Sequence, residues 1–181
     1  SQNRFNGNWN LTISYTYAIS EFKDNIGEYV STSWDNKHIF IITTTKKLDN
    51  DWAIGLKWRF AGGLPYTPYD LDLSSNIVAW DLNNRPYFDY SQLNSLRFKP
   101  FHQLDLRIDK SFNFKNSSLK FYIDIQNAYN FKSGSQDIYT ILDINGNKQF
   151  DPENSDKYLL RRIPSEGSGT IVPTIGIIID F

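Results

Sequence analysis

The chain has 181 residues, the length of one ordinary domain. Its 19 basic and 20 acidic residues leave a formal net charge of −1, so no strong positive field favours nucleic acid as a partner. Cysteine is absent, which excludes disulfides, thiolate metal ligands and cysteine nucleophiles. Methionine is absent too, and the chain begins at Ser1, so we expect a processed product or part of a longer protein. The sequence contains no apolar run of about 18 residues, so no transmembrane helix is predicted.

Alternation of apolar and polar residues predicts β-strands along much of the chain. Between residues 9 and 20, Leu11, Ile13 and Tyr15 share one face, and polar residues occupy the other. The same period of two predicts strands over residues 52–61, 103–112, 119–129 and 171–181. A sixth strand is expected over residues 37–47, with Phe40, Ile42 and Thr44 on its apolar side. The expected fold class is therefore all-β and antiparallel.

Short and long connections alternate between these strands. Tight turns are expected at 48–51 and 114–117, and long links at 21–36, 62–101 and 130–170. A two-residue turn at Lys115-Asn116 would place Arg107 opposite Asp124 and Ile108 opposite Ile123. Opposite charges would then meet on one face and apolar side chains on the other. The strands also have the roughly 9–11 residues that a tilted transmembrane strand needs. The pattern favours a transmembrane β-barrel with short periplasmic turns and long extracellular loops over a soluble sandwich.

Two groups of side chains fit a barrel wall. Aromatic residues near the short turns predict an interfacial girdle, formed by Trp9, Trp52, Phe112 and Phe114. Charged residues on the polar faces predict a lumenal ladder, formed by Asp105, Arg107, Asp109, Lys120 and Asp124. We expect the ladder residues to satisfy one another, a plug domain or water, and not to catalyse a reaction.

The end of the chain carries the most specific pattern. Thr174 and Gly176 precede a hydrophobic residue, Ile179, and a terminal aromatic residue, Phe181. This resembles the C-terminal signal by which Gram-negative outer-membrane barrels are recognised by their assembly machinery. An apolar terminal strand can pair with an open sheet edge of that machinery by β-augmentation.

Four segments, in order, resemble the TonB-dependent outer-membrane receptors, particularly the Bacteroidetes type. The first is Phe60-Ala-Gly-Gly-Leu-Pro-Tyr-Thr-Pro-Tyr69, which contains the Gly-x-Pro-Tyr-Thr-Pro motif of those receptors. The others are Phe101-His-Gln-Leu-Asp-Leu-Arg-Ile-Asp-Lys110, Phe121-Tyr-Ile-Asp-Ile-Gln-Asn-Ala-Tyr-Asn130 and Pro173-Thr-Ile-Gly-Ile-Ile-Ile-Asp-Phe181. The resemblance covers roughly residues 35–181.

The resemblance implies a 22-stranded barrel plugged by an N-terminal domain, of which residues 1–181 would supply the last six strands. Such receptors lie in the Gram-negative outer membrane and import scarce nutrients such as siderophores, cobalamin, glycans or peptides. The implied partners are the lipid bilayer, the assembly machinery, the remaining strands and plug, and the TonB complex reached through the plug. No enzymatic activity and no cofactor are expected.

The link over 62–100 is rich in aromatic residues that could stack on a ligand at the barrel mouth. The candidates are Tyr66, Tyr69, Trp80, Tyr87 and Tyr90. They could instead simply pack the loop on itself. In the last long link, Asn145-Gly146 predicts a type I′ hairpin turn in preference to a calcium loop, because the glycine stands at the wrong position for an EF-hand. No metal site is predicted, and capping or loop packing is expected of His38 and His102.

Two alternatives stay open at this point. One is an outer-membrane barrel that does not transport, such as an adhesin or an assembly scaffold, which would share the terminal signal. The other is a soluble β-domain that binds a ligand between its strands. In that case the apolar faces would form a core instead of meeting lipid.

Overall fold

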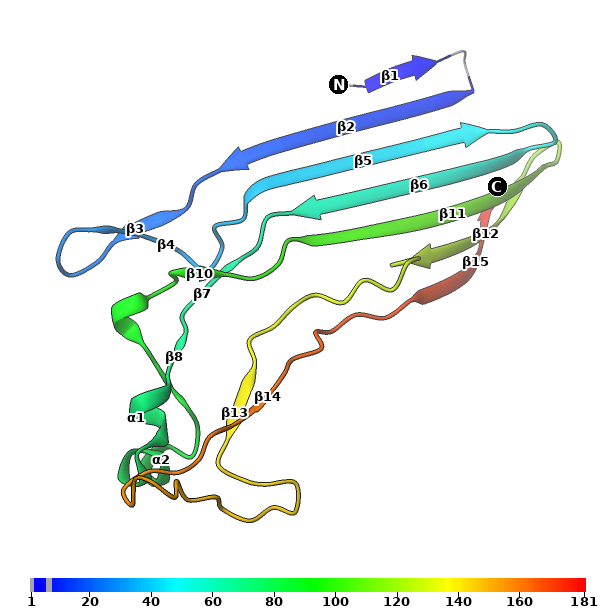
Figure 1. Ribbon diagram of the computed structural model, residues 1–181. Coiled ribbons are helices and arrows are strands. Elements are labelled where there is room, and N and C mark those ends of the chain that lie inside the picture. The colour runs from blue at the N-terminus through cyan, green and yellow to red at the C-terminus, as the bar shows by residue number, and fades with distance from the viewer. Residues whose placement is uncertain (1, 6–7) are drawn as a thin grey trace.

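An antiparallel sheet of seven strands forms the body of the computed structural model, which describes residues 2–5 and 8–181 (Figure 1). In order across the sheet, the strands are β1 (Gln2–Phe5), β2 (Trp9–Ala18), β5 (Lys37–Lys47), β6 (Trp52–Ala61), β11 (Phe101–Asn113), β12 (Ser118–Gln126) and β15 (Val172–Asp180). Each strand pairs with the next in this order, so the described sheet is an open meander with β1 and β15 at its edges.

The six long strands confirm the sequence prediction, and β1 is an addition to it. Four residues are too few to show a convincing alternation, which is why β1 was not expected. Its backbone pairs with β2, where Gln2 lies opposite Thr12 and Phe5 opposite Trp9. The all-β, antiparallel class is therefore correct.

The strand register agrees with the expected pairing. Arg107 lies opposite Asp124 and Ile108 opposite Ile123. The Phe114 N–H donates to the Ser117 carbonyl at 2.9 Å, which closes the turn between β11 and β12. In the turn between β5 and β6, Asn50 and Asp51 both have positive φ, at 58° and 59°. Asn and Asp tolerate that conformation better than most residues, so this turn suits its sequence.

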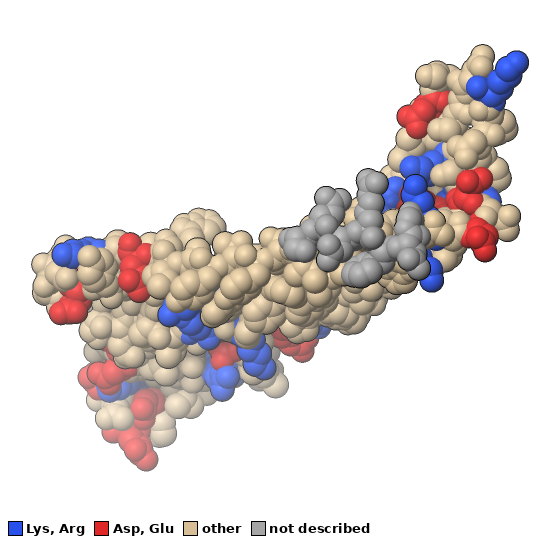
Figure 2. Space-filling view, turned by 90° about the horizontal axis from the view of Figure 1, so that it is seen from above, with Lys and Arg blue, Asp and Glu red and all other residues tan. Residues whose placement is uncertain are grey.

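The two sides of the sheet differ in chemistry. The first side, here called the apolar face, carries cross-strand rows such as Phe40 opposite Phe60 and Ile42 opposite Trp58. The second side, here called the charged face, carries the five predicted ladder residues, Asp105, Arg107, Asp109, Lys120 and Asp124. In the space-filling view, the strands form a largely uncharged band, with charged side chains gathered at its ends and along one side (Figure 2).

The three long links lie together at one end of the sheet, and the short turns lie at the other (Figure 1). They contain β3 (Glu21–Lys23), β4 (Tyr29–Ser31), β7 (Pro65–Tyr66), β8 (Tyr69–Asp70), α1 (Leu71–Ser75), α2 (Ile77–Asn83), β9 (Tyr87–Phe88), a 3₁₀ turn (Tyr90–Gln92), β10 (Leu96–Arg97), β13 (Ile138–Thr140) and β14 (Arg161–Ile163). Both described α-helices are far too short to cross a bilayer.

The buried hydrophobic cluster lies in these links and not on the sheet. Among the described side chains, only Trp80, Ile141 and Tyr158 are buried hydrophobic residues. Ile77 and Leu160 pack against them. The cluster joins α2 to the link that follows β12, so two long links share one small core. The sheet itself has no second layer within the described part of the chain.

Two adjacent glycines allow close backbone approaches at the base of the second long link, one to the first long link and one between the two ends of the second link itself. A Cβ atom at Gly62 would lie 2.0 Å from the Asn36 carbonyl oxygen, and one at Gly63 would lie 1.8 Å from the Phe98 carbonyl oxygen. Both obstacles are backbone atoms, which cannot rotate away as a side chain can. These glycines open the Gly-x-Pro-Tyr-Thr-Pro segment, so their place in it has a steric reason.

We predict that Gly63→Ala weakens the packing of the long links by about 1–3 kcal/mol, because it overpacks a backbone contact. Amide hydrogen exchange around residues 94–98 should become faster. Gly134→Ala is the matched control, because a Cβ atom there meets nothing within 4 Å. Equal exchange in both variants would contradict the steric role of Gly63.

Candidate functional site

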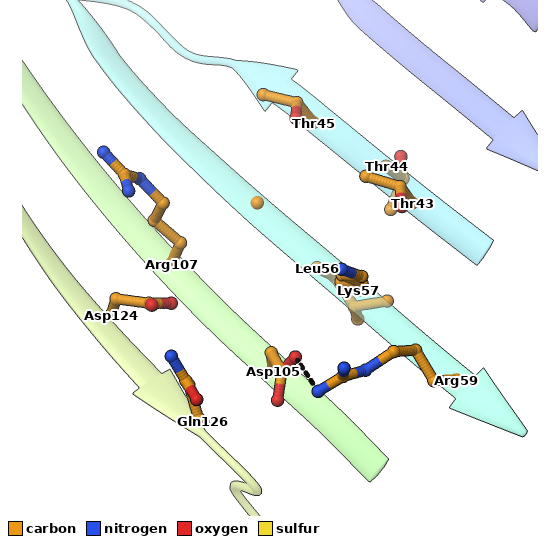
Figure 3. Close-up of a pocket in the computed structure, with 11 residues that line it drawn as sticks. Thr43, Thr44, Thr45, Leu56, Lys57, Arg59, Asp105, Arg107, Asp124 and Gln126 are labelled. Carbon is orange, nitrogen blue, oxygen red and sulfur yellow. Dashed lines mark hydrogen bonds and ion pairs between the residues drawn. The ribbon is translucent and has the colours of Figure 1, made fainter. Parts of the chain in front are cut away.

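The charged face is hollowed and lined by polar groups (Figure 3). A hollow of about 360 Å³ is bordered by residues of β5, β6, β11 and β12, including Thr43, Lys57, Arg59, Asp105 and Arg107. Arg59 pairs with Asp105 at 3.1 Å. Arg107 pairs with Asp109 at 2.8 Å. The predicted ladder residues therefore share one face, as expected, and Arg59 is a member that the prediction missed.

The ladder residues differ in how well they are paired. Asp105 accepts hydrogen bonds from Arg59, from Gln103 at 2.6 Å and from the Asn127 N–H at 3.0 Å. Lys120 and Asp124, by contrast, form no ion pair with any described residue. Lys57, which borders the hollow, likewise forms no ion pair with a described residue, so the charged face keeps several charged groups available for water or for a partner.

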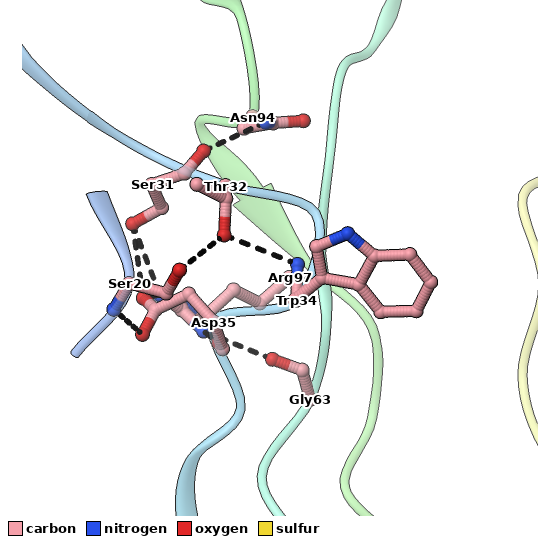
Figure 4. Close-up of polar contacts among 8 residues, drawn as sticks. All are labelled: Ser20, Ser31, Thr32, Trp34, Asp35, Gly63, Asn94 and Arg97. Atoms are coloured by element: carbon pink, nitrogen blue, oxygen red, sulfur yellow. Dashed lines mark hydrogen bonds and ion pairs between the residues drawn. The ribbon is translucent and has the colours of Figure 1, made fainter. Parts of the chain in front are cut away.

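At the long-link end of the sheet, a buried carboxylate joins the first two long links (Figure 4). Asp35 is 0% exposed. It forms an ion pair with Arg97 and accepts hydrogen bonds from the Ser20 N–H at 3.1 Å and the Ser31 hydroxyl at 3.0 Å. Arg97 also donates to the Gly63 carbonyl at 3.0 Å. We call Ser20, Ser31, Asp35, Gly63 and Arg97 the loop clasp.

The loop clasp sets the protonation of Asp35. Burial opposes ionisation of the carboxylate, but the hydrogen bonds from Arg97, the Ser20 N–H and Ser31 outweigh it. They hold the pKa of Asp35 below its ordinary value of 3.8. The clasp is therefore ionic at neutral pH.

The third long link is closed by an amide side chain. Asn127 is 7% exposed and has a positive φ of 54°. Its Nδ2 donates to the Phe131 carbonyl at 2.9 Å and to the Thr170 carbonyl at 3.2 Å, and its Oδ1 accepts from the Phe131 N–H at 2.7 Å. Asn127 thus joins the start and the end of that link, directly beside Asp105.

A groove lies between the second and third long links. It has a volume of about 400 Å³ and is lined by Tyr66, Phe98, Lys132, Gln136 and Asp137, among others. Tyr66 stacks on Phe98 with ring centroids 4.3 Å apart. A smaller adjoining hollow of about 210 Å³ shares Tyr66, Gln136 and Asp137 with the groove and adds Tyr69. An aromatic surface beside amide and charged groups can hold a ligand that is partly apolar and partly polar.

The predicted ligand-binding aromatics separate into distinct environments. Tyr66 and Tyr69 line the groove region, so the structure brings these two together. Tyr87 donates its hydroxyl to the Ala79 carbonyl at 2.9 Å and packs the link internally. Tyr90 is 73% exposed and lies outside the groove.

The prediction for Trp80 was wrong. Trp80 is only 6% exposed and packs against Ile141 and Tyr158. Lys148 donates to Asp81 and to the Tyr158 hydroxyl, both at 2.9 Å, at the edge of this cluster. Trp80 therefore holds two links together instead of offering its ring to a ligand. Sequence could not show this, because its partners follow it by more than 60 residues.

The turn at Asn145-Gly146 also differs from the prediction. Gly146 has a φ of +84°, but Asn145 is not among the residues with positive φ. The Gly146 N–H donates to the Asp143 carbonyl at 3.3 Å, which places Gly146 just after a turn centred on Ile144 and Asn145. Asp143 accepts from the Asn145 and Asn147 N–H groups, each at 2.8 Å. In the described part of the chain, no group of three or more His, Asp and Glu side chains could hold a metal ion.

The two histidines occupy similar positions beside the long links. His38 Nδ1 lies 2.9 Å from the Tyr15 hydroxyl, and His102 Nδ1 lies 2.7 Å from the Tyr129 hydroxyl. His102 also packs on Phe131, with centroids 4.0 Å apart. Both contacts agree with the expected packing role.

The C-terminal strand carries a stacked contact on the charged face. Gly176 lies opposite Tyr122, and a Cβ atom at Gly176 would be 2.3 Å from the Tyr122 ring. The Arg107 guanidinium lies 4.1 Å from the centre of that ring. Gly176 therefore makes room for Tyr122. Phe181, in contrast, is fully exposed beyond the end of the strand.

Comparison with known proteins finds no matching family model, no matching curated protein and no matching solved structure.

We predict that Arg97→Gln opens the loop clasp, because it leaves the Asp35 carboxylate buried without its cation. The free energy of local opening should fall by about 1–3 kcal/mol. Hydrogen exchange of the Ser20 and Asn36 amides should rise by the corresponding factor. Arg85→Gln is the control, because Arg85 hydrogen-bonds only to nearby Asn83. A similar rise in both variants would argue against the clasp.

Acid should open the same clasp. Because the pKa of Asp35 is lowered in the folded protein, its contribution to stability is present above pH 3.8 and is lost as pH falls through the lower folded value. Exchange of the clasp amides, corrected for intrinsic rates, should stay constant from pH 7 to about pH 4 and accelerate below that. In Asp35→Asn this acid-induced step should disappear. A step that persists in the variant would assign it to another carboxylate.

Proposed function

We propose that this chain is the C-terminal part of the β-barrel of a TonB-dependent outer-membrane receptor, of the Bacteroidetes type. Its function would be to bind a scarce nutrient outside the cell and to import it with energy relayed by the TonB complex. The receptor would be an importer and not an enzyme. The remaining barrel strands would pair with the open edges of the sheet, and the plug would face the charged hollow.

The observation that carries this proposal is the apolar face. Its isoleucines and aromatic rings are exposed along the strands, with Ile175 at 78%, and no described element covers them. Leaving one such side chain in water instead of an apolar environment costs about 1.5–3 kcal/mol. A lipid environment removes that cost for every strand at once, and the strands have the length that a bilayer requires.

The distribution of the links supports the same proposal. Long links lie at one end of the sheet and short turns at the other, which is the arrangement of outer-membrane barrels. The Gly-x-Pro-Tyr-Thr-Pro segment begins where β6 ends, so it lies at the base of a long link. If that end faces the cell exterior, the groove lined by Tyr66 and the adjoining hollow lined by Tyr69 face incoming ligands.

We expect the protein to be found in the outer-membrane fraction and to require detergent for solubility. A compact form that becomes slower in gel electrophoresis after heating would identify a folded barrel. A stable, folded monomer in buffer without detergent would contradict the proposal and favour a soluble β-domain. The presence of a plug domain upstream of these strands would separate a transporter from a barrel that does not transport.

The terminal residue should matter for assembly. Phe181→Ala removes the fully exposed ring that ends the chain, so the yield of folded barrel should fall several-fold while the yield of total protein changes little. Phe150→Ala is the matched control, because Phe150 is an exposed phenylalanine in a long link. Equal folded yields from both variants would show that Phe181 has no special role.

A further inference from the structure

Two positions on the apolar face carry lysine instead of an apolar residue. Lys46 lies opposite Trp9 and Ile54, and Lys110 lies opposite Trp52 and Phe121. Both lysines therefore lie on the side of the sheet that is otherwise apolar. The other lysines of the six long strands, Lys37, Lys47, Lys57 and Lys120, fall on the charged face in the same register.

Both lysines lie at the short-turn end of the sheet and contact aromatic rings. The Lys46 ammonium lies 5.0 Å from the centre of the Trp9 ring. The Lys110 ammonium lies 5.5 Å from the centre of the Trp52 ring and 5.2 Å from that of Phe112. These contacts hold the long side chains against the sheet without neutralising them.

The charge of this region is uncompensated. On the apolar face of the six long strands, all of whose residues are described, the register places no Asp or Glu. Neither Lys46 nor Lys110 forms an ion pair with a described residue; Lys110 donates to the Asn50 carbonyl in the adjacent turn. At the opposite end of the apolar face of these six strands, the residues that can carry a positive charge are His38 and His102. Permanent positive charge is therefore confined to the short-turn end.

The geometry suits one phosphate between two cations. Lys46 on β5 and Lys110 on β11 are two strands and two residues apart, which strand spacing converts to about 12 Å between their Cα atoms. Two four-carbon stems can close that distance from opposite sides of one anion. The indole N–H groups of Trp9 and Trp52 are further donors at the same level, and indoles of this kind concentrate at the headgroup level of a membrane.

We propose that Lys46 and Lys110, with Trp9 and Trp52, form a binding site for the phosphate headgroup of an anionic phospholipid. The lipid belongs to the leaflet at the short-turn end, and its acyl chains lie along the apolar face. This inference rests on the proposed function, because it needs the apolar face to meet lipid. Charge complementarity selects an anionic lipid, since two cations without a carboxylate attract a net negative headgroup more than a zwitterionic one.

The test uses the whole protein extracted from membranes in a nonionic detergent. Equal amounts of phosphatidylglycerol and phosphatidylcholine with identical acyl chains are added, and bound lipids are counted by native mass spectrometry. The unaltered protein should prefer phosphatidylglycerol, and each lysine should contribute about fivefold. Lys46→Gln with Lys110→Gln should reduce the preference to about one.

Charge-matched variants separate the site from a general electrostatic effect. Lys47→Gln with Lys120→Gln removes two positive charges from the same end of the sheet but from its charged face, and should leave the preference unchanged. Lys46→Arg with Lys110→Arg should also retain it, which separates loss of charge from loss of folding.

Three outcomes would overturn the proposal. The first is equal binding of both lipids to a protein that is embedded in the outer membrane, which leaves the proposed function intact. The second is an equal loss of preference in the Lys47 and Lys120 variant. The third is displacement of the lipid by inorganic phosphate at a similar concentration, which would assign the site to a free anion. A protein that is soluble without detergent would overturn both this inference and the proposed function.

Discussion

The register of pairing between the antiparallel strands is the constraint on which the rest of this structure depends. Successive side chains of a strand point to opposite sides, so a slip of one residue would exchange the two faces of that strand. Asp105 and Arg107 would then enter a row of isoleucines and indoles, and apolar side chains would enter the charged hollow. The tight turn at Asn50 and Asp51 fixes the register of β5 and β6, and the short turn at Lys115 and Asn116 fixes that of β11 and β12. The pairs β2–β5, β6–β11 and β12–β15 are joined by long links, so their register follows from the alternation of apolar and polar residues in the strands themselves.

Buried polar groups fix the arrangement of the long links, as backbone pairing between strands fixes the arrangement of the sheet. The four buried polar residues among the described side chains are Asp35, Thr67, Ser74 and Asn127. Thr67 accepts from the Asn94 N–H at 3.0 Å, and Ser74 accepts from the Tyr87 N–H at 2.8 Å. All four lie in the links and bind backbone groups there. Since a buried polar group is costly unless it is hydrogen-bonded, these residues define one arrangement of loops that have little hydrophobic core.

The sequence predicted the features that repeat locally and missed those that depend on distant partners. Alternation identified the six long strands, their apolar sides and the alternating link lengths, because each of these depends on neighbouring residues. The loop clasp escaped prediction because Asp35 and Arg97 are 62 residues apart in the chain. For Trp80 the sequence left ligand contact and loop packing both open, since aromatic content alone cannot separate a buried ring from an exposed one. Tyr66 and Tyr69 line one hollow together because they are three residues apart at the start of the same link.

The turn at Asn145-Gly146 shows a finer limit. The dipeptide is common in two-residue turns, but the carboxylate of Asp143 binds the following N–H groups and sets a different backbone path. The choice between the two turns depends on a side chain outside the dipeptide. The dipeptide identifies where the chain reverses, whereas Asp143, two residues before it, decides how it reverses.

The position of the loop clasp has a consequence for how the surface of this protein can vary. Ser20 and Thr32 close the base of the first link, where the Thr32 N–H donates to the Ser20 carbonyl at 2.8 Å, and Gly63 and Arg97 close the base of the second. The segments beyond these bases, including the β3–β4 hairpin, are attached to the sheet only through them or through other links. Lengthening a closed loop adds entropy cost only slowly. Insertions and sequence changes at the tips should therefore be tolerated without disturbing the strands. The clasp would allow these tips to diversify rapidly during evolution while the sheet beneath them stays the same.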